Sequence, residues 1–169
     1  AASYDHMGKV LSVQQEYPLA IEYHQKSRAL FQQMPEENPD AFVCALRNLA
    51  HCHADLLEFD EALRYIQEGI RLLAPDFTPR SSYDNPPVDH ASVNPYLLWF
   101  MANNRGSILH QKFEQTQSVE DARACLHTYY WADSLLTSLR TDLFWEESRA
   151  GLVGGDARKW QNSAVVVAS

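Results

Sequence analysis

The side chains best suited to chemistry lie together at His51, Cys52 and His53. Imidazole and thiolate groups bind transition metals, and a cysteine activated by a histidine can act as a nucleophile. On a helix, however, residues two apart point about 200° away from each other, and adjacent residues also diverge. The two histidines therefore cannot chelate one ion from a regular helix, and Cys52 and His53 do not form a dyad. We expect a structural role for all three residues.

The remaining sequence carries no enzyme motif. It contains no glycine-rich phosphate loop, no HExxH, no nucleophile elbow and no CxxC pair. Glu36-Glu37 and Glu146-Glu147 are carboxylates at adjacent positions, which we expect on solvated surfaces. The sequence therefore predicts no catalytic residue, no metal site and no cofactor in this segment.

Composition restricts the class of protein further. The 169 residues carry a net charge of −8 and are 46% hydrophobic, as in one soluble domain. The acidic balance, without a basic run, argues against nucleic acid, and no stretch approaches the roughly 20 apolar residues that cross a membrane. Three scattered cysteines and the lack of a basic-then-apolar leader favour a reducing compartment. We expect a cytoplasmic protein.

An internal repeat indicates which elements position these residues. Seven positions recur after 42 residues, and they are Tyr4, Met7, Gly8, Leu11, Tyr17, Ala20 and Tyr23, followed by Leu46, Leu49, Ala50, His53, Phe59, Ala62 and Tyr65. Small residues at Gly8 and Ala20, and again at Ala50 and Ala62, allow two antiparallel helices to approach closely. The spacing predicts helical hairpins over residues 1–34 and 40–74.

This pattern resembles the tetratricopeptide repeat, in which a Leu-Gly or Leu-Ala pair is followed by a helix break and an alanine on the second helix. The usual period is about 34 residues, and residues 32–40 supply the extra length here. Gln15 and Leu57 stand where glycine is common in the family. The resemblance implies an all-α fold, a right-handed superhelical stack of about three hairpins with a partial fourth.

A third, more degenerate hairpin is expected over residues 94–140. Four residues lie 63 positions after Phe59, Ala62, Ile66 and Gly69, and they are Ala122, Cys125, Tyr129 and Ala132. Asn94-Pro95 resembles a helix N-cap followed by proline at the first helical position. Gly106 precedes Cys125 by more residues than Gly8 precedes Ala20, so we expect a longer loop over residues 113–118. A terminal partial repeat is expected over residues 141–169.

Residues 75–95 separate the second and third hairpins. They hold five of the eight prolines, which cannot continue a helix, so this segment is expected to run as an irregular loop along the surface. A spacer that lets the third hairpin stack is the simpler interpretation. A functional loop is the alternative, since loops of this length often carry function.

The carboxy-terminal third carries a second resemblance, to the last repeats of bacterial proteins that precede a caspase-like CHAT protease domain. Three runs carry it, and they are Tyr129-x-x-Ala132-Asp133-x-Leu135-Leu136-x-x-Leu139-Arg140, Phe144-x-x-Glu147-Ser148-Arg149 and Trp160-x-x-x-Ala164. The resemblance implies a sensing and scaffolding array whose partner or conformation controls a cysteine protease further along the chain.

The tetratricopeptide resemblance also implies a binding face. In that family the first helices line a concave groove, and matching positions give Asp5, Lys9, Arg47, Asn48, His51, Asp55, Asn103 and His110. This polar set of mixed charge suits an extended peptide or a docked helix, so the partner is expected to be a protein or peptide, including the chain's own downstream protease domain. A solvated helix face is the alternative for each residue.

Further hypotheses stay open. The chain can instead be a free-standing adaptor with a peptide in the groove, or a small all-α enzyme. Among Tyr129, Tyr130 and Trp131, which spread around a helix, one or two are expected in the core, and Trp131 or Tyr130 is expected to form part of a contact with the next domain. The apolar end at residues 164–167 predicts self-association through the C-terminal helix.

Overall fold

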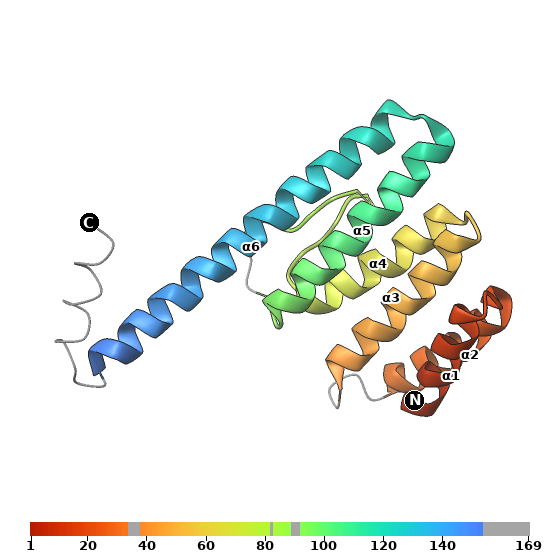
Figure 1. Cartoon of the computed structure of the whole chain (residues 1–169), viewed down its shortest axis with the longest axis horizontal. Coiled ribbons are helices and arrows are strands. Elements are labelled where there is room, and N and C mark those ends of the chain that lie inside the picture. The colour runs from red at the N-terminus through yellow and green to blue at the C-terminus, as the bar shows by residue number, and fades with distance from the viewer. Residues whose placement is uncertain (34–37, 82, 89–91, 154–169) are drawn as a thin grey trace.

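The computed structural model describes residues 1–33, 38–81, 83–88 and 92–153, with side chains as far as residue 141. In these ranges the chain forms helices without strands, and they are α1 (Ala2–Val13), α2 (Tyr17–Gln33), α3 (Pro39–Asp55), α4 (Phe59–Leu73), α5 (Pro95–Thr116) and α6 (Val119–Val153). Successive helices pair as hairpins, and the hairpins stack side by side (Figure 1). The prediction of an all-α stack of helical hairpins is confirmed.

The turns inside the first two hairpins have the same backbone conformation and the same backbone hydrogen bonds. Gln15 and Leu57 have φ values of 62° and 63°, the left-handed conformation that glycine adopts without strain. The amide of Gln15 donates to the carbonyl of Ser12 at 3.0 Å, and the amide of Leu57 donates to that of Ala54 at 2.9 Å. The 42-residue period therefore extends to backbone geometry, and the family's preference for glycine at this position has a conformational cause.

Small residues bring the paired helices together, as the spacing predicted. A Cβ built on Gly8 would lie 2.6 Å from Cε1 of His24 on α2, and one on Gly106 would lie 2.6 Å from Cε1 of Tyr129 on α6. Cys125 packs at the same interface, with its Sγ 3.5 Å from the carbonyl oxygen of Gly106. The third hairpin thus pairs its helices at Gly106 and Cys125, the positions that the alignment with the earlier hairpins predicted.

Most of the core lies between the second and third hairpins. Leu46 and Leu49 of α3, Ile66 of α4, and Met101 and Leu109 of α5 are fully buried in one cluster. The first hairpin is packed more thinly, because Gly8 is the only fully buried residue that α1 contributes. Helix α1 therefore depends more on polar contacts, such as those of Asp5 with Asn48 and His24.

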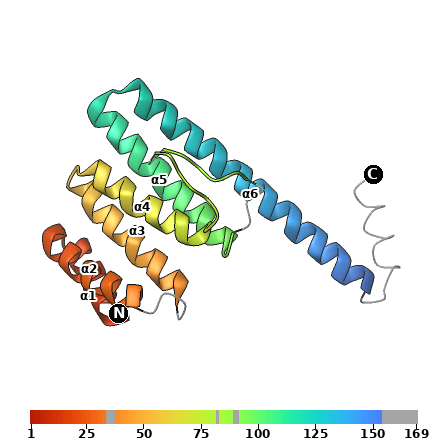
Figure 2. The same ribbon diagram turned by 180° about the vertical axis from the view of Figure 1, so that it is seen from behind.

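The third hairpin differs from its prediction. Helix α5 continues to Thr116, and only two residues separate it from α6, so the expectation of a long loop over residues 113–118 is wrong. The additional residues lengthen the two helices instead. Residues 141–153, which were expected to open a partial fourth repeat, continue α6 without a break, and this part projects beyond the other helices (Figure 2). The remainder of that partial repeat, including the apolar end at residues 164–167, lies outside the described residues.

Two helices begin with the same capping device. The Oδ1 of Asn94 accepts a hydrogen bond from the amide of Leu97 at 3.1 Å, and proline follows as the first helical residue of α5. Asn38 caps α3 in the same way, with Pro39 behind it. Asparagine satisfies an amide that has no partner inside the helix, and proline has no amide to satisfy. The N-cap predicted at Asn94 is confirmed.

The described residues of the proline-rich segment 75–93, called the insertion below, fold onto the helices. It runs beside α5 and α6 (Figures 1 and 2). The fully buried Arg105 of α5 donates from Nη1 to the carbonyl oxygen of Asp84 at 2.7 Å and to Oδ1 of Asn85 at 3.0 Å. Burial lowers the pKa of Arg105 to about 10, and the guanidinium still carries its charge at neutral pH.

A second polar cluster fixes the insertion at Tyr83. Its hydroxyl donates to Oδ1 of the buried Asp121 on α6 at 2.7 Å and accepts from Nζ of Lys112 on α5 at 3.0 Å. Lys112 also pairs with Asp60 of α4 at 2.7 Å. Burial opposes the charge on Lys112, but the hydrogen bonds to Asp60 and Tyr83 raise its pKa above the ordinary value. The insertion therefore joins α4, α5 and α6.

Candidate protein-binding face

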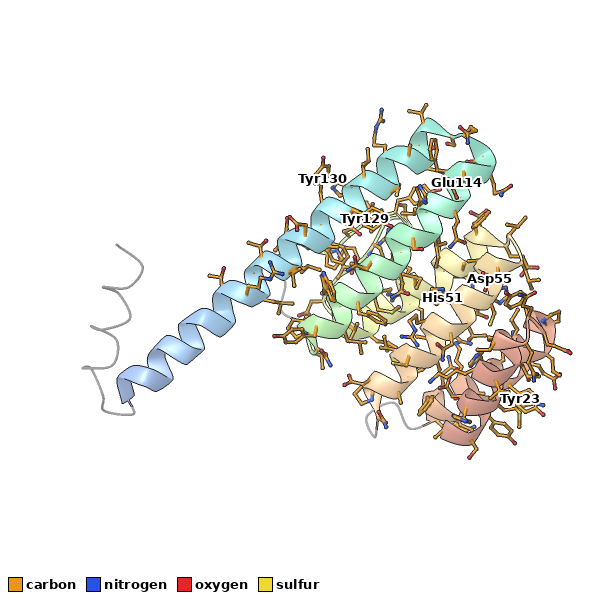
Figure 3. The ribbon with its side chains drawn as sticks, in the orientation of Figure 1. Tyr23, His51, Asp55, Glu114, Tyr129 and Tyr130 are labelled. Carbon is orange, nitrogen blue, oxygen red and sulfur yellow. The ribbon has the colours of Figure 1, made fainter. Side chains whose placement is uncertain are left out.

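The first helices of the three hairpins share one polar surface, called the first-helix face below. Its residues are Asp5, Lys9, Arg47, Asn48, His51, Phe100 and Asn104. They come from α1, α3 and α5, and hydrogen bonds cross from each helix to the next. Figure 3 shows His51 and Asp55 on α3, between the first hairpin and α5.

Asp5 connects α1 to α2 and α3. Its Oδ1 accepts from Nδ2 of Asn48 at 2.8 Å and lies 3.1 Å from Nδ1 of the buried His24, while Lys9 pairs with Oδ2 at 2.7 Å. Partial burial alone would raise the pKa of this carboxyl. The hydrogen bonds from His24, Lys9 and Asn48 outweigh burial and hold the pKa of Asp5 well below its ordinary range. Asp5 is therefore a fixed anion that orients its neighbours.

Two side-chain contacts join α3 to α5 on the first-helix face. Nε2 of His51 lies 2.6 Å from Oδ1 of Asn104, whose Nδ2 in turn donates to the carbonyl of Phe100 at 2.6 Å. The guanidinium of Arg47 lies 5.0 Å from the centre of the Phe100 ring, which is 38% exposed, and donates to Oδ1 of Asn48 at 2.8 Å. An exposed aromatic ring flanked by a cation thus lies where α3 meets α5 on this face.

The structure brings most of the sequence-predicted residues to this surface. Asp5, Lys9, Arg47, Asn48 and His51 share one chain of contacts, although Asn48 is largely buried and serves to join the helices. Exposed Asp55 ends α3 beside Tyr17, and burial together with this carboxylate raises the pKa of the Tyr17 hydroxyl.

On α5 the predicted residues are not the ones that bond to α3. Asn103 donates back to the carbonyl of Trp99 at 2.9 Å, and exposed His110 makes no hydrogen bond to the face within the described residues. The contacts come from Asn104 and Phe100, which sequence reasoning missed. When the small residues Ala50 and Gly106 are aligned, Asn104 is the counterpart of Asn48. This alignment could have identified Asn104 from the sequence.

The cluster at His51, Cys52 and His53 separates as its helix geometry predicts. His51 faces α5. By contrast, Nδ1 of His53 lies 2.6 Å from Oε2 of Glu58, and the His53 ring stacks on that of Tyr65 with the ring centroids 5.3 Å apart. Sγ of Cys52 lies 3.2 Å from Oγ of Ser12, and burial raises the pKa of its thiol, which opposes nucleophilic activation. Among the described residues, no group of three or more potential ligands could hold a metal ion.

Residues 1–74 match the tetratricopeptide repeat family. They correspond to the first two hairpins, and such repeats generally mediate protein–protein interaction and are typically non-catalytic. The third hairpin lies outside that match but continues the stack through α4 and α5. A search among curated proteins gave no match. No helix within the described ranges is long and apolar enough to cross a membrane.

The aromatic run on α6 divides between core and surface. Trp131 is buried, whereas Tyr129 lies on Gly106 and Tyr130 is 72% exposed. Both tyrosines lie on α6 in Figure 3. Of the two residues considered for a contact with a following domain, Tyr130 is the one that the helical array leaves accessible.

Proposed function

We propose that the chain binds a protein partner through its first-helix face, as the regulatory repeat region of a larger caspase-like protease of the CHAT type. One observation carries the first part. Side-chain hydrogen bonds cross from α1 to α3 and from α3 to α5, and the guanidinium of Arg47 lies beside the exposed ring of Phe100. Repeats of this family generally bind proteins, which supports placing the partner here.

The chemistry of the face suits a peptide or a helix. Exposed Lys9 and Asp55 offer charges of opposite sign, the guanidinium of Arg47 offers donors, and Phe100 offers an apolar anchor. The contacts of Asp5 and Asn104 hold these groups in place before binding, which reduces the entropy lost when a partner docks. An aromatic residue and an arginine at the centre of a patch are typical of residues that dominate binding energy.

Photocrosslinking tests this surface. We expect p-benzoylphenylalanine in place of Phe100 to give one discrete adduct with a protein or with a later part of the same chain. The matched control is Leu19 on α2, which has similar exposure but lies off the face. Equal adducts from both positions, or none from position 100, would argue against a partner at the first-helix face.

The protease association rests on the resemblance in α6, where Tyr129, Ala132, Asp133 and Leu135 match the repeats that precede CHAT domains. The projecting part of α6 offers a surface on which a following domain can dock (Figure 1). The coding sequence after Ser169 tests the association. Histidine and cysteine in caspase-like strand ends would support it, and a stop codon would remove it while leaving the first-helix proposal standing. We place the protein in the cytoplasm because its three cysteines are free.

A further inference from the structure

A hollow of about 480 Å³ lies between the outer side of α4 and the insertion. Arg64, Gln67 and Arg71 line it from α4, and Pro79, Arg80 and Ser81 line it from the insertion. These residues are on the second-helix side of the array, away from the first-helix face. The hollow exists because the insertion folds back along α4, held by Arg105 and Tyr83.

Gln67 is a buried polar side chain without a partner. Its residue is 8% exposed, and neither Nε2 nor Oε1 has a hydrogen-bond partner in the described part of the chain. A buried amide that lacks both bonds costs free energy, and most buried polar groups are satisfied. A side-chain amide carries one acceptor and a donor pair, which complement the N–H and C=O of a peptide group. The hollow therefore has a place for peptide backbone.

Two arginines at the hollow are available for an anion. Arg64 is paired with Glu61, and Glu68 is occupied by a bidentate contact with Arg28, at 2.8 and 2.9 Å from its Nη2. The guanidinium groups of Arg71 and Arg80 donate no hydrogen bond within the described residues, although the charge of Arg80 also attracts the carboxylate of Asp84. Their planar donors match carboxylate geometry. The free groups of the hollow are thus cationic, in a chain whose net charge is −8.

The hollow continues in both directions. A neighbouring one of about 350 Å³ shares Glu68 and Arg71 and adds Leu72 and Pro75. Another of about 570 Å³ shares Arg80 and extends to Phe77 and His127, but Asp76 and Asp84 also line it. A single small anion would fill one of these spaces, whereas an extended acidic chain can follow the two hollows along α4.

We propose that the two hollows along α4 bind an extended acidic peptide segment. Arg71 and Arg80 pair with its carboxylates, and Gln67 completes the hydrogen bonds of a backbone amide. The one acidic residue in the lining of these two hollows, Glu68, is already paired with Arg28, and at physiological ionic strength charges beyond about 8 Å are screened. The site is independent of the function proposed for the first-helix face.

Fluorescence polarisation with a labelled octaglutamate peptide and the whole chain tests the site. Such a peptide is extended because its charges repel. We expect it to bind, and octaglutamine of equal length to bind at least tenfold more weakly. The double variant Arg71→Glu/Arg80→Glu should lose at least tenfold in affinity. Arg123→Glu/Arg140→Glu on exposed positions of α6 makes the same change in net charge and should stay within twofold of the unmodified chain.

Gln67→Met separates binding from folding. Removing an unpartnered buried amide at nearly constant volume should raise the melting temperature by about 2–4 °C, while the affinity for octaglutamate falls. Arg47→Glu, on the first-helix face, should leave octaglutamate binding unchanged. The proposal is overturned if octaglutamate fails to bind at about 1 mM, if both double variants lose equal affinity, or if phosphate at matched ionic strength displaces the peptide completely.

Discussion

The buried imidazole of His24 lies directly on Gly8, so that a Cβ at Gly8 would come within 2.6 to 2.8 Å of three of its ring atoms. His24 cannot withdraw easily, because its Nδ1 is held by Asp5. Gly8→Ala should therefore lower the free energy of unfolding by about 1–3 kcal/mol, despite a gain of about 1 kcal/mol in helix propensity. Chemical denaturation measures the difference.

Gly106→Ala is the matched control for this substitution. The ring of Tyr129 lies equally close to Gly106 but is 40% exposed, and it can turn toward solvent. We expect a smaller loss than for Gly8→Ala. Equal stability of Gly8→Ala and the unmodified chain would contradict the close packing of α1 on α2.

Leu57→Gly is predicted to stabilise the chain. Leu57 has a φ of 63° and is 59% exposed, so glycine removes left-handed strain and sacrifices little burial. The net gain should be about 0.5–1 kcal/mol after the added entropy of the unfolded chain. Leu56 is the control, because its φ of −87° gives glycine no advantage there. A thermal melt in which Leu57→Gly is the less stable of the two variants would refute this account of the turn.

Acid should weaken the first hairpin through Asp5. Its pKa in the folded chain lies below the ordinary value of about 3.9, so the unfolded chain takes up this proton first as pH falls. The stabilisation is complete above about pH 4 and is lost progressively below it. Asp5→Asn should cost roughly 1–3 kcal/mol at neutral pH and flatten the dependence of stability on pH in acid. Asp76→Asn, at an exposed position, should retain that dependence, and an unchanged slope in Asp5→Asn would contradict the prediction.

Arg105 should control the attachment of the insertion. Arg105→Met removes the hydrogen bonds to Asp84 and Asn85 but keeps an apolar stem in the core. We expect trypsin to cleave after Arg80 at least tenfold faster, with helix content measured by circular dichroism retained. Arg123→Met on the surface of α6 is the control. Cleavage at the same rate in both variants would show that other contacts hold the insertion.

The sequence predicted the hairpins because their cause is local. Gly8, Ala20, Ala50 and Ala62 must be small wherever two helices approach closely, and this requirement repeats with a fixed spacing. The length of α5 was not predicted, since spacing between Gly106 and Cys125 fixes the number of residues but not their division between helix and loop.

The candidate sites were harder to predict than the fold. Asn104 was missed although it precedes Gly106 by the same number of residues as Asn48 precedes Ala50. The groove positions carried over from the family pointed to Asn103 and His110 instead. Arg105 gives no sequence signal at all, since its burial depends on where residues 84 and 85 return in space. The same holds for the hollow beside Gln67, which requires the insertion to fold back along α4.

The affinity of the partner captured at Phe100 tests the central claim most directly. Isothermal titration should compare the unmodified chain with Arg47→Glu/His51→Ala, both checked for helix content. The loss of the cation beside Phe100 and of the donor to Asn104 should weaken binding at least tenfold. Unchanged affinity in this variant would show that the first-helix face is not the binding surface.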